Sequence, residues 1–362
     1  MSAHGKRSDG AAIPIDRRHG GVALPGVIDF SASVNPLGPP PQALEAYHLG
    51  VSRISSYPPS YADTLEARIA EWAGVARERV IAANGSTQLI HLLARVLGSR
   101  CPSVVIPTFS EIANALVRAG STPQAISLRR ERSFVLDVAD IDAALETGAD
   151  AVFVGRPNSP TGGIIDLGTA LDIAARCARH GAWCVFDEAF VDFVDDAESL
   201  AGSTVDNPHL IVLRSLTKIF AIPGLRLGFA VAAPEIIARL RDAIEPWSVN
   251  VAAENVALAC LENPAGYLRR TRETIARERA FLVERLSSTP GFRVFPPTAN
   301  FLMIEIESEE SPGAFGAQML TQGIAVRDLA ELPGCHPGLY RIGVRLRAEN
   351  EKLLSAIRTG RS

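Results

Sequence analysis

Short apolar runs alternate with amphipathic segments through the middle of the chain. The almost continuous apolar runs predict strands at residues 80–83, 103–107, 151–155, 183–187, 210–214 and 227–232. Segments with one apolar face predict helices between them, at residues 88–97, 111–119 and 167–180. Strands that are apolar on both faces and alternate with helices are typical of a mostly parallel sheet covered by helices on both sides. The pattern therefore predicts an α/β fold.

The chain has a different character on either side of this central part. Residues 1–26 are rich in Gly, Arg and Ser and are predicted to form a flexible N-terminal arm. After Trp247 the chain carries a long charged helix and several short strand patterns, at residues 264–287, 292–295, 300–306 and 340–344. We expect residues 27–50 and 247–362 to form a smaller α+β domain, and residues 51–246 to form the large domain that carries the site.

Composition and charge narrow the class of protein. Of the 362 residues, 47% are hydrophobic and 21% charged, which is typical of a globular enzyme. A net charge of −4 gives no reason to expect nucleic acid or an anionic membrane as a partner. No apolar run suits a membrane span, and the polar N-terminus shows no signal peptide. The five scattered cysteines form no Cys-x-x-Cys pair, so we expect reduced thiols, no metal site and a cytoplasmic location.

The lysines single out one position. Only Lys6, Lys218 and Lys352 are present, and Lys218 alone has apolar neighbours. Desolvation and nearby cations lower the pKa of a lysine amine, which lets it react with a carbonyl group. Ser215 precedes Lys218 and Arg226 follows it, and both suit an anionic phosphate. The spacing Ser-x-x-Lys-x-x-x-x-Pro-Gly-x-Arg-x-Gly therefore indicates a pyridoxal 5′-phosphate site, whereas Ser-x-x-Lys alone would also suit a surface turn or a serine acylase.

Four further loops follow predicted strands, where ligands of open α/β sheets bind. Gly85 and Ser86 open a helix whose free N–H groups suit an anion, although serine also caps many helices. Phe109 can stack on an aromatic ring or pack in the core. Asn158, in a loop with two prolines, can donate to a phenolic oxygen or hold a turn. Asp187, at the end of an apolar strand, can pair with a protonated pyridine nitrogen, cap a helix, or do both.

In this order, the motifs resemble those of fold-type I pyridoxal phosphate enzymes of the aspartate aminotransferase superfamily. The resemblance implies a large domain with a mostly parallel, seven-stranded type of sheet and a smaller α+β domain. It implies that Lys218 binds the cofactor covalently and then moves protons, while Asp187 pairs with the pyridine nitrogen. It also implies further cofactor contacts by Gly85, Ser86, Phe109, Asn158, Ser215 and Arg226.

The same resemblance extends to three other positions. Tyr57 resembles the tyrosine that reaches the cofactor phosphate of a neighbouring subunit, which requires a homodimer. Arg341 resembles the arginine that binds the substrate carboxylate. Arg156 is a departure, because the family usually has asparagine there. Since Arg156 only flanks the cofactor contact, we expect no loss of activity from it.

Three segments resemble a narrower family, the threonine-phosphate decarboxylases of cobalamin biosynthesis. They lie at residues 19–21 with 29–38, at 214–226 and at 246–250. The resemblance implies conversion of L-threonine O-3-phosphate to (R)-1-amino-2-propanol O-2-phosphate and CO2. The candidates for binding this phosphorylated amino acid are Arg341, Arg327, Arg345, His19 and Asn35. His19 lies in a glycine-rich arm that can close as a lid, but it also suits a solvated tail, and the arginines suit surface ion pairs.

Two alternatives stay open. A histidinol-phosphate-type aminotransferase acting on a phosphorylated amino substrate shares the same motifs, because the bond that is broken depends on small side-chain placements. A non-catalytic protein with this fold is the other alternative, and the intact Lys218, Asp187 and Arg226 argue against it.

Overall fold

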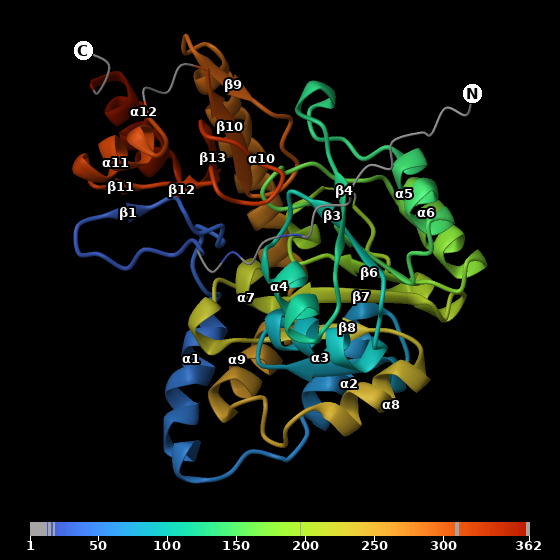
Figure 1. Cartoon of the computed structure of the whole chain (residues 1–362). Coiled ribbons are helices and arrows are strands. Elements are labelled where there is room, and N and C mark those ends of the chain that lie inside the picture. The colour runs from blue at the N-terminus through green and yellow to red at the C-terminus, as the bar shows by residue number, and fades with distance from the viewer. Residues whose placement is uncertain (1–12, 14–15, 17–18, 196, 308–310, 360–362) are drawn as a thin grey trace, which may run out of the picture.

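A seven-stranded sheet forms the centre of the larger part of the computed structural model, which describes residues 13, 16, 19–195, 197–307 and 311–359 (Figure 1). The strand order is β2-β8-β7-β6-β5-β3-β4, with β8 antiparallel to both of its neighbours and all other pairs parallel. The strands are β2 (Val80–Ala83), β3 (Pro102–Ile106), β4 (Gln124–Ser127), β5 (Ala151–Gly155), β6 (Trp183–Asp187), β7 (Leu210–Ser215) and β8 (Gly228–Val231). The predicted α/β fold and mostly parallel sheet are confirmed.

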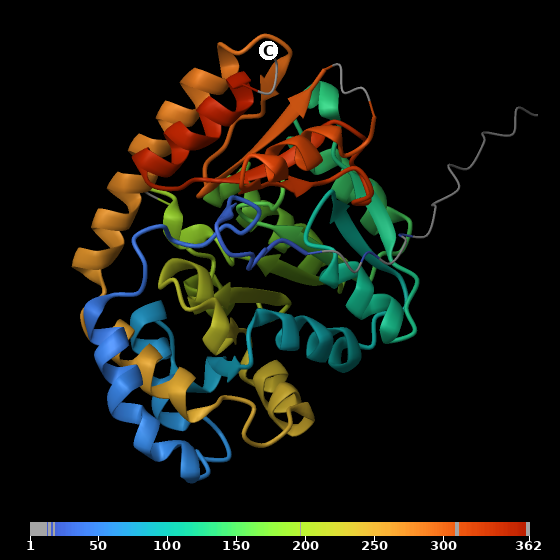
Figure 2. The same cartoon turned by 90° about the vertical axis from the view of Figure 1, so that its left-hand side faces the viewer.

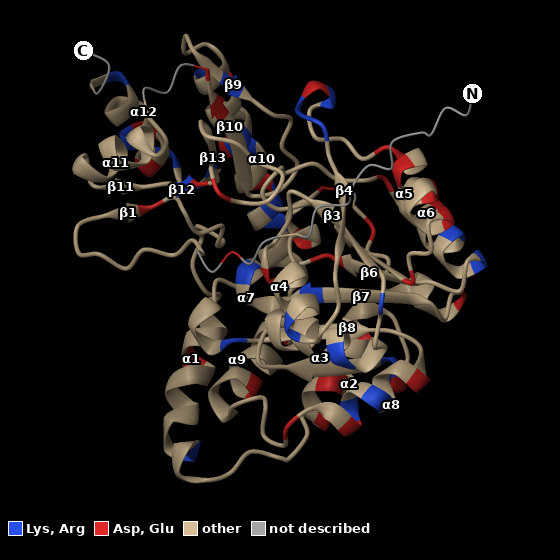
Figure 3. Cartoon of the chain, in the orientation of Figure 1, with Lys and Arg blue, Asp and Glu red and all other residues tan. Residues whose placement is uncertain are grey.

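Helices cover both faces of this sheet, which is why its strands are apolar at nearly every position. Val104 and Val105, adjacent on β3, belong to hydrophobic cores on opposite faces. The first core includes α3 (Ser86–Leu97), α4 (Glu111–Arg118) and α8 (Pro234–Ala243), and the second includes α5 (Val138–Glu146) and α6 (Leu167–Arg179). Acidic and basic residues are mixed on the outer helices α2 (Asp63–Ala73) and α8 (Figure 3).

The C-terminal part builds a second sheet. Its four antiparallel strands have the order β12-β13-β10-β9, and a parallel pair, β1 with β11, lies beside it. The strands are β1 (Ile28–Asp29), β9 (Phe292–Val294), β10 (Phe301–Ile306), β11 (Ile324–Ala325), β12 (Arg327–Asp328) and β13 (Leu339–Gly343). The helices are α10 (Ala265–Ser287), α11 (Ala314–Thr321) and α12 (Arg347–Thr359).

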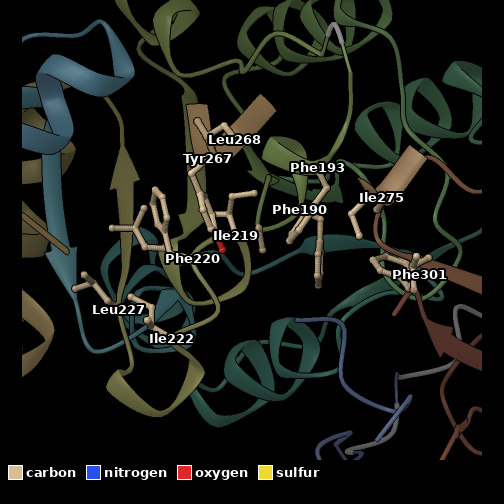
Figure 4. Packing of buried hydrophobic residues seen from close by; sticks show 14 of the residues in the cluster. Phe190, Phe193, Ile219, Phe220, Ile222, Leu227, Tyr267, Leu268, Ile275 and Phe301 are labelled. Carbon is tan, nitrogen blue, oxygen red and sulfur yellow. The ribbon is translucent and has the colours of Figure 1, made fainter. Parts of the chain in front are cut away.

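One hydrophobic core joins the two parts. Phe190, Phe220, Tyr267 and Phe301 belong to it, and they come from loops, from α10 and from β10 (Figure 4). The core reaches α7 (Leu216–Ile219), the single helical turn that carries Lys218. Two further helices, α1 (Pro41–Gly50) and α9 (Val251–Glu262), pack against each other, and α9 also packs on α2.

The segment predicted as a flexible arm falls partly outside the described residues, which omit 1–12, 14–15 and 17–18. Of its described residues, Ile13 and Asp16 are buried, and Ile13 packs in the same core as α4. The chain that follows passes between the two parts of the molecule (Figure 2). This path brings residues near position 20 to the space where both parts meet.

Several elements were not predicted from the pattern. They are β4, α5, α8, α9, α11, β11 and β12. The helix α9 has apolar and small residues on most sides and is buried on several of them, so it lacks the single apolar stripe that marks an amphipathic helix. Within the described part of the chain, no helix is both long and apolar enough to cross a membrane.

Candidate active site

A cavity of about 510 Å³ lies where the strands of the large sheet end. The last residues of β5, β6 and β7, which are Gly155, Asp187 and Ser215, all line it. This is the edge at which open α/β sheets bind ligands. Ten of the predicted site residues line the cavity: His19, Gly85, Ser86, Phe109, Asp187, Ser215, Lys218, Arg226, Arg327 and Arg341.

Burial is the main cause of the pKa shifts of both Lys218 and Asp187, although the two side chains carry opposite charges. Burial lowers the pKa of the Lys218 amine to about 8, with repulsion from Arg341 and Arg226 adding to the effect and Asp187 opposing it. Burial also raises the pKa of Asp187 to about 6, although the N–H of Ala189 donates to its Oδ1 at 3.0 Å. A lysine that can lose its proton near neutral pH is the group that a carbonyl cofactor requires.

An anion cradle lies at the start of α3. Gly85 has φ +82°, and a Cβ added there would lie 2.8 Å from Arg226 Nη2. A Cβ on Gly228 would lie 2.3 Å from the backbone nitrogen of Ser86. Glycine at both positions therefore lets the backbone and a guanidinium converge on one spot, where the first N–H groups of α3 have no partner within the helix. Ser215 lines the same cavity, so a phosphate fits here.

Asn158 makes hydrogen bonds within the protein, and its predicted contact with the phenolic oxygen of the cofactor stays a prediction. Its side chain is buried and does not line the cavity, because Thr108 Oγ1 donates to its Oδ1 at 2.9 Å while its Nδ2 donates to Pro107 O at 2.8 Å and Thr161 Oγ1 at 3.1 Å. The amide thus holds two loops together. The neighbouring Ser159 lines the cavity instead, and its hydroxyl accepts a hydrogen bond from Arg341 Nη1 at 2.9 Å.

Asn35 and Arg345 were predicted to contact substrate, but they do not line the cavity. The Nδ2 of Asn35 lies 2.8 Å from the carbonyl oxygen of Ile219, so this buried amide supports the helical turn of the lysine. Arg345 donates to the carbonyl oxygen of Asp29 at 3.2 Å and to Glu349 at 2.9 Å. Both side chains therefore make structural contacts outside the cavity lining.

Tyr57 also lies away from the cavity of its own chain. Its side chain is 84% exposed and stacks beside Trp247, with the ring centroids 5.1 Å apart. An exposed aromatic pair of this kind is suited to a protein interface.

Two arginines from the smaller part of the molecule, Arg327 and Arg341, line the same cavity as Lys218. Arg341 Nη2 donates to the carbonyl oxygen of Ser31 at 2.6 Å, and Arg327 Nη2 lies 3.7 Å from Asp16 Oδ2. Burial and the neighbouring Arg327 lower the pKa of Arg341 to about 10, so it is still a cation at neutral pH. The cavity therefore offers two positive groups that are separate from Arg226 in the anion cradle.

Several polar residues that line the cavity were not among the predicted site residues, and Ser33, Glu111 and Ser159 are three of them. Ser33 is 4% exposed, and its hydroxyl has no hydrogen-bond partner among the described residues. A buried hydroxyl without a partner in a cavity wall is a candidate ligand contact. The only sequence signal for Ser33 was its place within the segment 29–38.

Arg156, the departure from the family pattern, is fully buried and does not line the cavity. Its Nη1 donates to Glu188 Oε1 at 2.7 Å, and its Nε donates to the carbonyl oxygen of Ile165 at 2.8 Å. Glu188 follows Asp187 in the chain, and the pairing with Arg156 supplies the partner that a buried carboxylate needs. Arg156 therefore stabilises the end of β6 through Glu188, without lining the cavity.

A lysine with a lowered pKa, a carboxylate at a strand end and an anion cradle fit the amine-reactive carbon, the ring nitrogen and the phosphate of one cofactor. Together with the fold they define a pyridoxal 5′-phosphate-dependent enzyme.

Comparison with known proteins agrees with this class. The model of the aminotransferase class I and II family matches residues 25–357, and the chain belongs to that family. A threonine-phosphate decarboxylase from Salmonella typhimurium is 34% identical over 99% of this chain and 96% of its own length. A histidinol-phosphate aminotransferase from Moorella thermoacetica is 32% identical over 95% of this chain and 88% of its own length. Among solved structures, the histidinol-phosphate aminotransferase from Clostridium acetobutylicum superposes with a TM-score of 0.84 at 26% identity, covering 91% of this chain and 98% of its own.

Proposed function

We propose that the protein decarboxylates L-threonine O-3-phosphate to (R)-1-amino-2-propanol O-2-phosphate and CO2, as a step of cobalamin biosynthesis. The observation that carries this proposal is the pair of arginines, Arg327 and Arg341, that line the cavity with Lys218. Threonine phosphate carries two anionic groups, a carboxylate and a phosphate, whereas histidinol phosphate carries only the phosphate. Two cationic groups besides Arg226 supply one partner for each anionic group of threonine phosphate. The similarity to the Salmonella typhimurium enzyme supports the same assignment.

Each residue has a role that its position suits. Arg226, Ser215, Gly85 and Ser86 would hold the cofactor phosphate, and Asp187 would pair with the ring nitrogen. Phe109 would pack against the ring. When bound, the cofactor draws electrons from the substrate Cα and so weakens the bonds to that carbon.

Lys218 supplies proton transfer. With its pKa near 8, the Nζ amine can give up a proton near neutral pH and return one. As the carboxylate leaves as CO2, a proton from Nζ takes its place on Cα, which balances the reaction. Arg341 and Arg327 would fix the substrate so that the Cα–carboxylate bond stands perpendicular to the ring, the orientation in which that bond breaks.

A direct assay separates this proposal from the aminotransferase alternative. The purified holoenzyme is mixed with L-threonine O-3-phosphate, and released CO2 and aminopropanol phosphate are measured. We expect one CO2 per substrate consumed, with the cofactor still in its aldehyde form. Conversion of the cofactor to pyridoxamine phosphate, and turnover of histidinol phosphate with a 2-oxo acid, would instead establish the aminotransferase.

We also propose a homodimer in the cytoplasm. Large apolar side chains are exposed on α1, on the 3-10 helix Val51–Ser55 that follows it and just beyond, including Tyr47, Leu49, Ile54 and Tyr57. Monomeric proteins seldom expose so many together, and a second copy of the chain would cover them. The cysteines are unpaired, with Cys177, Cys184 and Cys260 buried, which suits a reducing compartment. Sedimentation of the holoenzyme tests the dimer, because a monomer mass at micromolar concentration contradicts it.

A further inference from the structure

Glu111 is a buried carboxylate on the wall of the cavity that the proposed reaction does not use. It begins α4, is 7% exposed, and lines the cavity next to Phe109. Its Oε1 accepts from Asn114 Nδ2 at 2.8 Å and lies 3.3 Å from His19 Nε2. Its Oε2 lies 3.0 Å from His91 Nε2 and 3.3 Å from Arg118 Nη1. Four donors from three segments thus converge on one carboxylate.

The network continues from Glu111 into the N-terminal segment. Asn114, which is 1% exposed, donates from Nδ2 to the carbonyl oxygen of Asp16 at 2.6 Å and accepts from the Asp16 N–H at 3.3 Å. The Asp16 carboxylate lies 3.7 Å from Arg327, across the cavity on β12. A continuous chain of contacts therefore runs from α4 through the N-terminal segment to the arginine side of the cavity.

The charge on Glu111 is what holds this network. Burial raises the pKa of Glu111, but the hydrogen bonds from Asn114 and His91 and the charges of Arg118 and His19 outweigh it and leave the pKa below its ordinary value. Glu111 is therefore an anion at neutral pH and attracts the imidazole of His19. That imidazole lies beside the ring of Phe109, with the centroids 5.9 Å apart, and both residues line the cavity. His19 and its neighbour Gly20 both line the cavity, so the contact with Glu111 holds His19 at the ligand space.

We propose that Glu111 is a positioning residue that holds His19 in the wall of the cavity and sets its imidazole to contact the bound anionic substrate. The identity of that substrate rests on the proposed function, but the positioning role does not. Ordering a chain segment before binding removes an entropic cost that the substrate would otherwise have to overcome. Glu111 thereby acts through His19 on affinity, and it is separate from the lysine and carboxylate that serve the cofactor.

Hydrogen exchange of the holoenzyme without substrate tests the positioning role. We compare wild type with Glu111→Gln and with the matched control His91→Gln, which removes another partner of the same carboxylate but leaves the bond to His19. In Glu111→Gln, we expect the amides of Asp16 and of residues 19–22 to exchange about tenfold faster, since the negative charge that attracts His19 is lost. The His91→Gln protein should exchange as wild type does. Equal exchange in wild type and Glu111→Gln would overturn the proposal.

Steady-state kinetics with threonine phosphate tests the link to His19. We expect Glu111→Gln and His19→Gln each to raise KM roughly tenfold, the size of one charge-assisted hydrogen bond, with kcat within about twofold of wild type. The double variant should be no worse than either single variant, because both remove the same interaction. Additive effects would overturn the proposal.

His19 is 47% exposed, so its replacement should leave folding intact even if Glu111→Gln is unstable. If threonine phosphate is not turned over at all, the proposed function fails, while the exchange experiment still decides the role of Glu111.

Discussion

The floor and the rim of the cavity are built in different ways. The floor carries Asp187 and Lys218, which follow neighbouring strands of one buried sheet, so the sheet itself fixes their relative position. The rim carries His19, Arg327 and Arg341, which come from distant parts of the chain and meet only through the packing of the smaller part and the N-terminal segment. In the proposed function, the floor holds the cofactor and the rim holds the substrate.

The largest effect is expected at the floor. Lys218→Ala removes the amine that we propose reacts with the cofactor and carries the proton, so we expect kcat to fall by about four orders of magnitude or more. The absorption band of the bound cofactor should change to that of free pyridoxal phosphate. Lys352→Ala, a change of the only other lysine among the described residues, is the control. If Lys218→Ala keeps the band and the activity, the floor has been assigned wrongly.

Asp187→Asn should have the second largest effect. An amide cannot hold a positive charge on the ring nitrogen, so the electron-withdrawing power of the cofactor falls and kcat drops by roughly 10² to 10³. KM should stay within a few-fold, because the rim is untouched. Measuring kcat and KM separately therefore distinguishes an effect on the floor, which lowers kcat, from an effect on the rim, which raises KM. A change confined to KM would show that Asp187 acts on substrate binding instead.

Burial of the Lys218 ammonium should lower the free energy of unfolding of the apoprotein. Its pKa is near 8 when folded and 10.5 ordinarily, so below pH 8 the folded state holds a buried ammonium, and stability rises with pH between 8 and 10.5. Lys218→Met should raise the free energy of unfolding of the apoprotein by about 3 kcal/mol at pH 7. Urea unfolding at several pH values checks this. The advantage of the variant should shrink from pH 8 to 10.5, and a constant difference would contradict a titrating lysine.

The sequence named residues of both the floor and the rim that line the cavity, but it did not predict the contacts that hold the rim, for physical reasons. A motif such as Ser-x-x-Lys or the Asp187 strand end places its side chain within one turn of a regular element, so spacing carries the geometry. By contrast, Glu111 and Arg118 on an amphipathic helix are indistinguishable in sequence from a surface ion pair. Asn158 and Ser159 are adjacent polar residues in one loop, and only the folded loop decides which side chain faces the cavity.

Arg341→Lys tests the rim. Lysine keeps the charge but loses the planar fork with which Arg341 bonds both Ser159 and Ser31, so its ammonium is held less firmly. We expect kcat/KM to fall about thirtyfold, mostly through KM, with the cofactor band unchanged. An altered cofactor band would place Arg341 on the floor rather than the rim. Titration with threonine phosphate and an absorption spectrum provide both measurements.

The smallest effects should distinguish Asn158 from Ser159, which lie side by side at the boundary between floor and rim. Asn158→Ala leaves Thr108 Oγ1 and the carbonyl oxygen of Pro107 without their partner, so we expect unfolding free energy to fall by about 1–3 kcal/mol. Its activity should change by no more than a few-fold. Ser159→Ala should leave stability nearly unchanged and raise KM about threefold, because Arg341 loses one acceptor.

Thermal unfolding and kinetics of the two variants decide between the structural and the cofactor role of the loop amide. A stable Asn158→Ala protein with a shifted cofactor band and little activity would support the predicted contact of Asn158 with the cofactor. The arrangement seen in the structure predicts the reverse division, with stability at Asn158 and substrate affinity at Ser159. Because the two residues are adjacent in the chain, the two variants show whether stability and substrate affinity depend on different side chains of one loop.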